Sequence, residues 1–130
     1  MSPRSALTET DQLVAQYPPA TQALIAASRR TLRAAFPRVT ETANEKARLL
    51  GFSYGPGYKG VVATLILSKV GAKIGIPYGA SLPDPAGLLR GAGRVHRHIA
   101  ITSVADLSRP ALRQLLAAAL VAWQRRSDGA

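Results

Sequence analysis

The chain has 130 residues and no cysteine, and 17 lysine and arginine residues against 7 aspartate and glutamate residues give it a formal net charge of +10. This length indicates one domain, and a hydrophobic content of 47% is enough for a core without disulfide or metal support. The absence of cysteine excludes thiolate metal sites, a disulfide framework and a cysteine nucleophile. The positive charge indicates an anionic partner such as nucleic acid, phosphate or a carboxylate metabolite, although a solvated basic surface explains it equally well.

No stretch has the pattern of a targeting or membrane segment. Met1 to Ala6 contains one arginine and no apolar core of the kind that secretory signals carry. The longest apolar run, Val61 to Leu67, is far shorter than the roughly 20 residues of a membrane-spanning helix. We therefore expect a cytoplasmic protein with no membrane partner.

Helical patterns dominate the N-terminal part. Thr8 and Asp11 have the spacing of a capping pair and predict a short helix that extends to about Gln16. Pro19 can occupy the first position of a second helix, and Pro37 ends that helix. The inner face of the second helix is a mostly apolar stripe, which consists of Leu24, Ile25, Ser28, Leu32, Ala35 and Phe36.

The middle of the chain predicts β-strands. Val61 to Leu67 is a nearly continuous apolar run rich in β-branched residues, as is typical of a buried strand. Ala72 to Tyr78 alternates as a half-buried strand does, after a hairpin-sized turn. A further alternating strand is expected up to Ile101, and its core-facing residues would be Val95, Arg97, Ile99 and Ile101.

Two adjoining segments before these strands have mixed secondary-structure patterns. Glu41 to Leu50 has helical propensity, but it is short and uncapped, and we predict a strand there. Gly51 to Gly60 contains four glycines and one proline, which predicts a loop or a bulged turn.

The C-terminal part predicts one long helix. Ser103 and Asp106 form a second capping pair before a short helical turn, and Ser108 is the expected N-cap of the long helix, with Pro110 in its first turn. Its apolar face has helical spacing and consists of Leu112, Leu115, Leu116, Ala119, Leu120 and Trp123. Arg125 and Arg126 suit the negative C-terminal end of the helix dipole.

Helices at both ends with strands between them predict a single α+β domain over residues 1–126. We expect an antiparallel sheet of about four to six strands, packed on one face by the N-terminal and C-terminal helices. Residues 127–130 would form a flexible tail.

The best candidate for a ligand site is the glycine- and arginine-rich segment from Leu88 to Ile99. Its two glycines let the backbone approach a ligand, and their N–H groups could bind an anion. Its arginines could donate to phosphate or carboxylate in bidentate geometry. An ordinary turn with solvated arginines fits the same pattern, because the motifs of a P-loop and of a dinucleotide-binding turn are both incomplete. The candidate ligand-binding residues are Arg90, Gly91, Gly93, Arg94, Arg97 and His98.

Arg97 falls on the predicted core-facing side of its strand. Its side chain can bury its stem and carry the guanidinium to the end of the sheet. Otherwise it needs a buried partner such as Asp84 or Asp106.

Histidines and tyrosines are the other side chains in the sequence with a spacing or position that suits chemistry. His96 and His98 have a spacing that metal ligands can use, but no third ligand follows, so we assign no metal and no cofactor. Tyr54, Tyr58 and Tyr78 lie beside glycine- or proline-containing turns, where they could line a ligand pocket or close the end of the core. No nucleophile elbow, acid/base pair or metalloprotease motif is present, so we assign no catalytic residue.

The segment from Leu82-Pro83-Asp84-Pro85 through Gly87 to Arg94 and on to Arg97-His98-Ile99 resembles the signature of the YdhG-like domains of unknown function. In that family this stretch precedes a Ser-x-x-Asp-Leu turn, here Ser103 to Leu107, and an alanine- and leucine-rich terminal helix. The glycine-rich loop from Tyr54 to Tyr58 and the strand from Ala72 to Ile76 are also similar, and the resemblance covers about residues 20–124.

The resemblance implies a frataxin-like arrangement, with helices on one face of an antiparallel sheet. Some family members are labelled iron chaperones, and frataxin-type iron binding uses an acidic ridge. The first two predicted helices hold Glu9 and Asp11 against three arginines, and a chain with this net charge should repel Fe²⁺.

Our leading hypothesis is therefore a non-catalytic cytosolic binding module for an anionic small molecule or a protein partner, acting through Arg90 to His98. The alternatives are a frataxin-like intracellular iron chaperone and a non-specific nucleic-acid binder. Specific nucleic-acid binding is not expected, because the basic residues are dispersed. A homodimer remains open.

Overall fold

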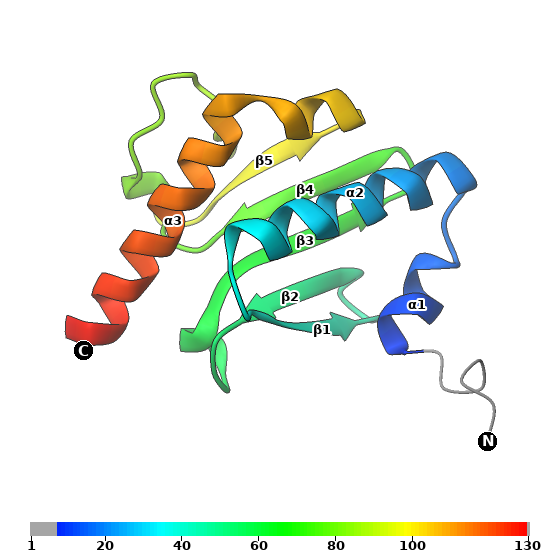
Figure 1. The fold of residues 1–130 in the computed structure, drawn as a ribbon, viewed down its shortest axis with the longest axis horizontal. Coiled ribbons are helices and arrows are strands. Elements are labelled where there is room, and N and C mark those ends of the chain that lie inside the picture. The colour runs from blue at the N-terminus through cyan, green and yellow to red at the C-terminus, as the bar shows by residue number, and fades with distance from the viewer. Residues whose placement is uncertain (1–7, 130) are drawn as a thin grey trace.

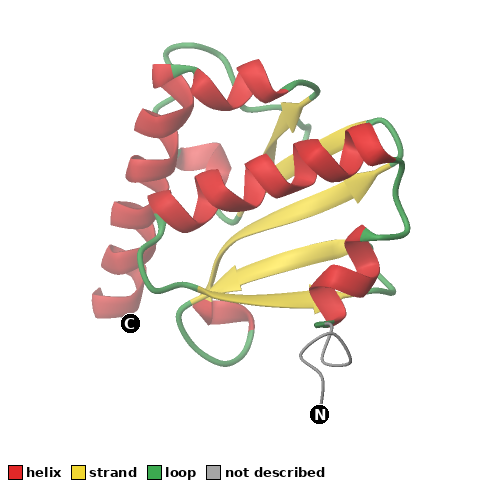
Figure 2. Ribbon diagram, turned by 45° about the vertical axis from the view of Figure 1, so that its right-hand side comes forward, coloured by secondary structure: helices red, strands yellow, loops and turns green. Residues whose placement is uncertain are grey.

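The computed structural model describes residues 8–129, which form a five-stranded antiparallel sheet and three α-helices. The strands are neighbours in chain order, and both α2 and α3 pack against the sheet (Figure 1). Figure 2 shows the same layers, with the helices in red and the strands in yellow. This confirms the predicted α+β architecture. The elements are α1 (Glu9–Val14), α2 (Pro19–Ala35), β1 (Thr40–Asn44), β2 (Leu49–Ser53), β3 (Val61–Ser68), β4 (Gly71–Ile76), β5 (Arg97–Ile101), α3 (Pro110–Gly129) and the 3-10 turns η2 (Tyr58–Gly60), η3 (Gly79–Ser81) and η4 (Val104–Ser108).

The helix starts follow the predicted caps, with one exception. The Thr8 hydroxyl accepts the Asp11 N–H at 3.0 Å, and Ser103 and Asp106 form a capping box at η4. Ser108 was predicted as the N-cap of α3, but it is the last residue of η4, and α3 begins two residues later at Pro110. Proline suits the first helical position because it has no N–H and a helix-like φ, and this explains the later start.

The segment predicted as one strand from Glu41 to Leu50 is a hairpin. Its ends lie in β1 and β2, and between them the Asn44 side chain accepts the Ala47 N–H at 3.0 Å while Arg48 adopts a left-handed φ of 57°. The predicted loop starts later than expected, because β2 continues to Ser53.

Two strand boundaries also differ from the prediction. β4 ends at Ile76, before the predicted end at Tyr78, which has a left-handed φ of 60° and ψ of 22°. β5 begins at Arg97 because the chain bends just before it. Val95 therefore lies outside the strand and is 42% exposed, so its predicted place in the core is wrong.

The core lies between the sheet and the helices. Its largest fully buried side chains come from both layers and are Phe36, Phe52, Leu13, Ile25, Leu32, Leu50, Leu65, Ile74, Ile76, Ile101, Leu112 and Leu116. Ser28 is also fully buried, and its hydroxyl donates to the Leu24 carbonyl at 2.9 Å. α3 continues to Gly129, into the segment that was expected to be a tail. Among the described residues, no helix is long and apolar enough to cross a membrane.

Candidate functional site

The three tyrosines that the sequence singles out line one pocket. Tyr54 follows β2, Tyr58 begins η2, and Tyr78 follows β4, so each lies just beyond or between strands. The C-terminal half of α3 supplies Trp123 and Arg126 to the same hollow, whose volume is about 400 Å³. We call this hollow, lined by these five residues and their neighbours, the aromatic pocket.

The loop that carries Tyr58 depends on a glycine. The Tyr54 N–H donates to the Gly60 carbonyl at 2.9 Å, which closes the loop over residues 54–60. A Cβ atom on Gly60 would lie 2.3 Å from the Gly55 carbonyl oxygen, whereas a Cβ on Gly55 would meet no atom within 4 Å. The close approach of the two loop arms therefore requires glycine at position 60.

Trp123 connects α3 to this loop. Its indole N–H donates to the Lys59 carbonyl at 3.0 Å. Its ring lies against Tyr54, with a centroid separation of 5.0 Å and a tilt of 40°. The indole thus has the polar partner that a half-buried tryptophan usually finds, and it fixes one wall of the pocket.

His96 holds the two remaining tyrosines. The Tyr78 N–H donates to His96 Nδ1 at 3.1 Å, and His96 Nε2 lies 2.9 Å from the Tyr58 hydroxyl oxygen. Because Nδ1 accepts a hydrogen bond, the neutral ring carries its proton on Nε2 and donates it to Tyr58. The imidazole also makes edge contacts with both phenol rings, at centroid separations of 6.1 Å and 5.6 Å.

Arg126 brings a free positive charge to the aromatic pocket. Its guanidinium carbon lies 4.3 Å from the centroid of the Tyr78 ring, in a cation–π contact. It forms no ion pair with any residue that the structure describes, and no described residue that lines the pocket is acidic. The in-plane N–H groups of this arginine are therefore available to an anion.

The hydroxyl of Tyr54 is affected by its surroundings in the pocket. Burial raises the pKa of its hydroxyl, and the positive charge of Arg38 offsets part of that rise. Tyr54 is therefore neutral at physiological pH and contributes an apolar ring and a hydroxyl.

The predicted glycine and arginine segment forms a closed loop beside β5. The backbones of Arg90 and His98 exchange two hydrogen bonds, of 2.7 Å and 3.1 Å. The Arg97 guanidinium donates to the carbonyls of Gly91, at 3.2 Å, and of Gly93. The Arg97 guanidinium therefore binds carbonyl groups of its own loop, whereas the Arg94 side chain is exposed to solvent.

The contacts of Arg97 correspond to the first of the two predicted alternatives, in which the guanidinium is carried away from the core. Neither predicted carboxylate partner is used. The Asp84 carboxylate accepts the N–H groups of Leu88 and Leu89, each at 2.8 Å. Asp106 accepts bonds from Thr102 and Ser103.

The two histidines do not share a site. His96 lies before β5 and contacts the tyrosines, whereas His98 lies within the strand. Burial lowers the pKa of His98, and the charges of Lys73 and Arg90 lower it further. Within residues 8–129, no group of three or more histidine, aspartate or glutamate side chains is placed to hold a metal ion.

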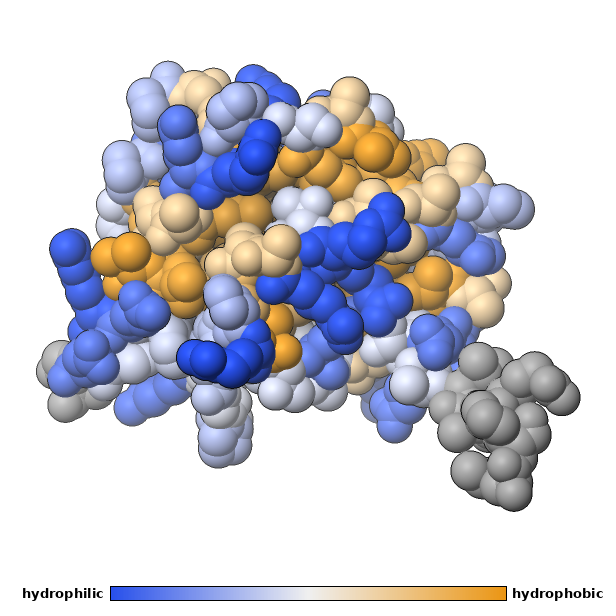
Figure 3. Space-filling view, in the orientation of Figure 1, coloured by the Kyte–Doolittle hydropathy of each residue, from blue (hydrophilic) through white to orange (hydrophobic). Residues whose placement is uncertain are grey.

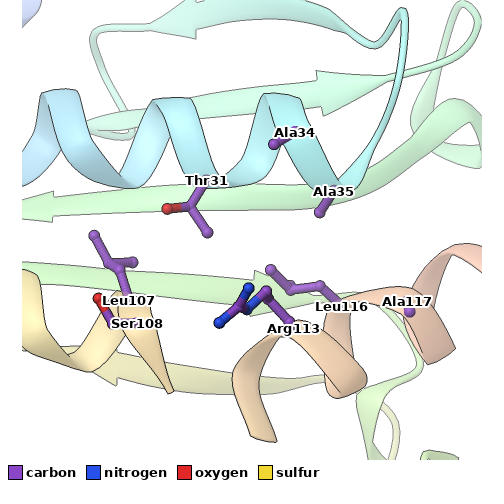
Figure 4. Close-up of a pocket in the computed structure, with 8 residues that line it drawn as sticks. All are labelled: Thr31, Ala34, Ala35, Leu107, Ser108, Arg113, Leu116 and Ala117. Carbon is purple, nitrogen blue, oxygen red and sulfur yellow. The ribbon is translucent and has the colours of Figure 1, made fainter. Parts of the chain in front are cut away.

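A second hollow, of about 500 Å³, lies between α2 and α3. Figure 4 shows Thr31 and Ala35 of α2 facing Arg113 and Leu116 of α3 across it. Figure 3 shows hydrophobic atoms exposed along the helix-covered face of the molecule. This groove offers small apolar walls and one guanidinium, and the Thr31 hydroxyl already donates to the Ala27 carbonyl at 3.1 Å. None of the described residues that line this groove is aromatic.

Sequence reasoning found the three tyrosines but missed His96, Trp123 and Arg126 as parts of one site. The sequence of α3 does contain a pattern that places two of these residues together. Trp123 ends the apolar stripe, and Arg126, three residues later, lies on the same side of a helix.

Comparison with known proteins gave no matching family model, no matching curated protein and no matching solved structure. The architecture is compatible with a frataxin-like fold, because N-terminal and C-terminal helices pack on a five-stranded antiparallel sheet.

Proposed function

We propose that this chain is a non-catalytic binding module for an anionic small molecule, which it holds in the aromatic pocket. The observation that carries the proposal is the position of Arg126, a cation without a carboxylate partner in the described chain, beside a hollow of about 400 Å³ walled by aromatic rings. A concave, mostly apolar pocket with a few directed polar groups is the usual form of a small-molecule site. A low-dielectric wall also strengthens the attraction between a guanidinium and an anion.

The shape of the site favours a small molecule over a protein partner. The rings belong to three separate segments that converge on a hollow, rather than forming one flat patch. The net charge of +10 adds a favourable field for any anion.

We also propose that the chain is a YdhG-like domain with a frataxin-like fold that acts in the cytoplasm. The segment from Leu82 to Ile99 supports the family, and the observed architecture is compatible with it. The iron-chaperone label of some family members is not part of this proposal, because the charge of the chain opposes cation binding.

Neighbouring arginines provide a matched test of the site. Arg126→Gln removes the charge at the pocket, and Arg125→Gln removes the same charge from the preceding, exposed residue of α3. Citrate and inorganic phosphate should raise the melting temperature of the wild type and of Arg125→Gln, as ligands of the native state do. The rise should be lost in Arg126→Gln.

A full citrate-induced rise in Arg126→Gln would contradict the proposed site. Arg94→Gln then tests the segment that the sequence favoured. If that substitution alone abolishes the rise, the anion binds the loop of Gly91 to Arg97 instead.

A further inference from the structure

We propose that the ligand of the aromatic pocket is a planar aromatic ring with a carboxylate or phosphate attached directly to it or through a short link. The ring would stack on the tyrosines while its anionic group binds Arg126. This inference rests on the proposed function and narrows it to one chemical class.

Two of the aromatic side chains that line the pocket are exposed to solvent. Tyr58 is 63% exposed and Tyr78 is 43% exposed, although both belong to the pocket wall. They are among the most exposed large hydrophobic side chains of the described residues. Exposed aromatic rings that gather at a concave site are typical of binding surfaces.

These exposed rings are held in place before any ligand arrives. His96 contacts the Tyr58 hydroxyl at 2.9 Å and accepts the Tyr78 N–H at 3.1 Å. Tyr78 is held further by its left-handed backbone and by Arg126 over its ring. Rings that are already oriented lose little conformational entropy when a flat ligand stacks on them.

Two further lining residues of the pocket are aromatic. Tyr54 and Trp123 form a tilted pair at 5.0 Å, fixed by the bond from the indole to the Lys59 carbonyl. Aromatic surfaces prefer offset-stacked or edge-to-face partners because of their quadrupoles. A planar aromatic ligand can therefore gain ring–ring contacts with these lining residues, which a saturated ligand of the same size cannot.

The position of Arg126 determines where the charge of the ligand lies. Its guanidinium carbon is 4.3 Å from the Tyr78 ring centroid, so an anion on its free edge is close to a ring that stacks in the pocket. Only a ligand whose charge is near its ring can satisfy both contacts at once. An alkyl carboxylate has no aromatic ring to stack on the tyrosines.

Three matched probes test this inference by calorimetry. 2-Naphthoate is planar and anionic, decahydro-2-naphthoate is anionic and saturated, and 2-naphthamide is planar and neutral. We expect 2-naphthoate to bind about tenfold more tightly than either control, as contributions from several ring contacts and one charge contact imply. Tyr58→Leu should reduce the advantage of 2-naphthoate over its saturated analogue and leave the affinity for that analogue nearly unchanged.

The results of this calorimetry distinguish a failure of the aromatic-ligand inference from a failure of the proposed anion-binding function. Equal affinity for the two carboxylates, both weakened by Arg126→Gln, would overturn this inference and leave the proposed function intact. Equal affinity for 2-naphthoate and 2-naphthamide would contradict the anionic function itself. Absence of binding by any probe to the wild type would overturn this inference, and the citrate-induced rise in melting temperature would then decide the proposed function by itself.

Discussion

At the scale of single residues, the aromatic pocket is built from unusual backbone positions and a small set of directed contacts. Tyr78 has a left-handed φ of 60°, which costs a residue other than glycine about 1 kcal/mol or more. That cost is offset by the bond from its N–H to His96 and by the cation–π contact with Arg126. Strain of this kind at the pocket wall agrees with a role for Tyr78 beyond packing.

Gly60→Ala tests the residue-scale geometry of the pocket. The added Cβ would approach the Gly55 carbonyl oxygen to 2.3 Å and force the two arms of the loop apart. We expect the free energy of unfolding to fall by about 1–3 kcal/mol, as in other overpacked sites, and the affinity for 2-naphthoate to fall with it. Gly55→Ala is the matched control, because its Cβ would meet no atom within 4 Å. Equal denaturation midpoints for Gly60→Ala and the wild type would show that the loop is not constrained in this way.

At the residue scale, the sequence singles out residues whose type has a local meaning. The tyrosines stood out because they adjoin glycine- and proline-containing turns, and Arg97 because its charge conflicts with a core-facing position. The sequence pairs His96 with His98, two residues away, whereas the hydrogen-bond partners of His96 lie 38 and 18 residues away. Sequence spacing alone does not reveal such long-range hydrogen bonds.

At the scale of elements, the caps and the turns hold the helices against the sheet. Asp106 ties η4 to the end of β5, because its carboxylate accepts the N–H groups of Thr102 and Ser103 at 2.9 Å and 3.2 Å. The Thr102 N–H lowers the pKa of Asp106, and the Ser103 N–H, the Thr102 hydroxyl and the Arg109 charge add to this against the opposing effect of burial.

Asp106→Asn should therefore have a pH-dependent effect on stability. A carboxylate whose pKa is lowered in the folded state stabilises the protein above the unfolded-state pKa and loses that effect as the pH falls through the folded-state pKa. We expect the variant to lose about 1 kcal/mol at pH 7 and the difference from the wild type to shrink below about pH 4. Asp128→Asn, at the exposed end of α3, should show no comparable loss. Urea unfolding at the two pH values measures both, and a pH-independent difference for Asp106→Asn would refute the role of its charge.

Element-scale prediction worked best for helices, since their apolar stripes and caps are local. α2 begins at Pro19 as predicted, and the buried residues of α3 lie on its predicted stripe. The hairpin between β1 and β2 was not recognised because its turn uses Asn44 and a left-handed Arg48, not a glycine. The alternation of Leu50 and Phe52, both fully buried, could have extended the strand past Gly51.

At the scale of the whole molecule, positive charge dominates, and at least three of the seven acidic side chains are engaged in contacts within the chain. Glu41, whose side chain is 3% exposed, pairs with both Arg29 and Arg33 at 2.6 Å. Asp84 and Asp106 accept backbone N–H groups. Within the described chain these oxygens are committed to structural contacts, which leaves a basic surface that attracts anions.

This charge distribution predicts that the chain does not collect iron. Anaerobic calorimetry with Fe²⁺ should reveal no binding tighter than about 1 mM, because hard cations need several carboxylate oxygens and the net charge of +10 repels them. Stoichiometric binding in the micromolar range would contradict this prediction and restore the iron-chaperone hypothesis.

The central claim is that an anion binds in the aromatic pocket, and Trp123 offers a direct reporter. It is the single tryptophan of the chain, so the ¹⁵N-labelled protein has one indole N–H resonance, which belongs to the pocket wall. Titration with 2-naphthoate should shift that resonance saturably in the wild type and in Arg125→Gln, and much less in Arg126→Gln. An indole resonance that does not move while the amide resonances of Gly91 and Gly93 do would contradict the claim and place the anion beside Arg97.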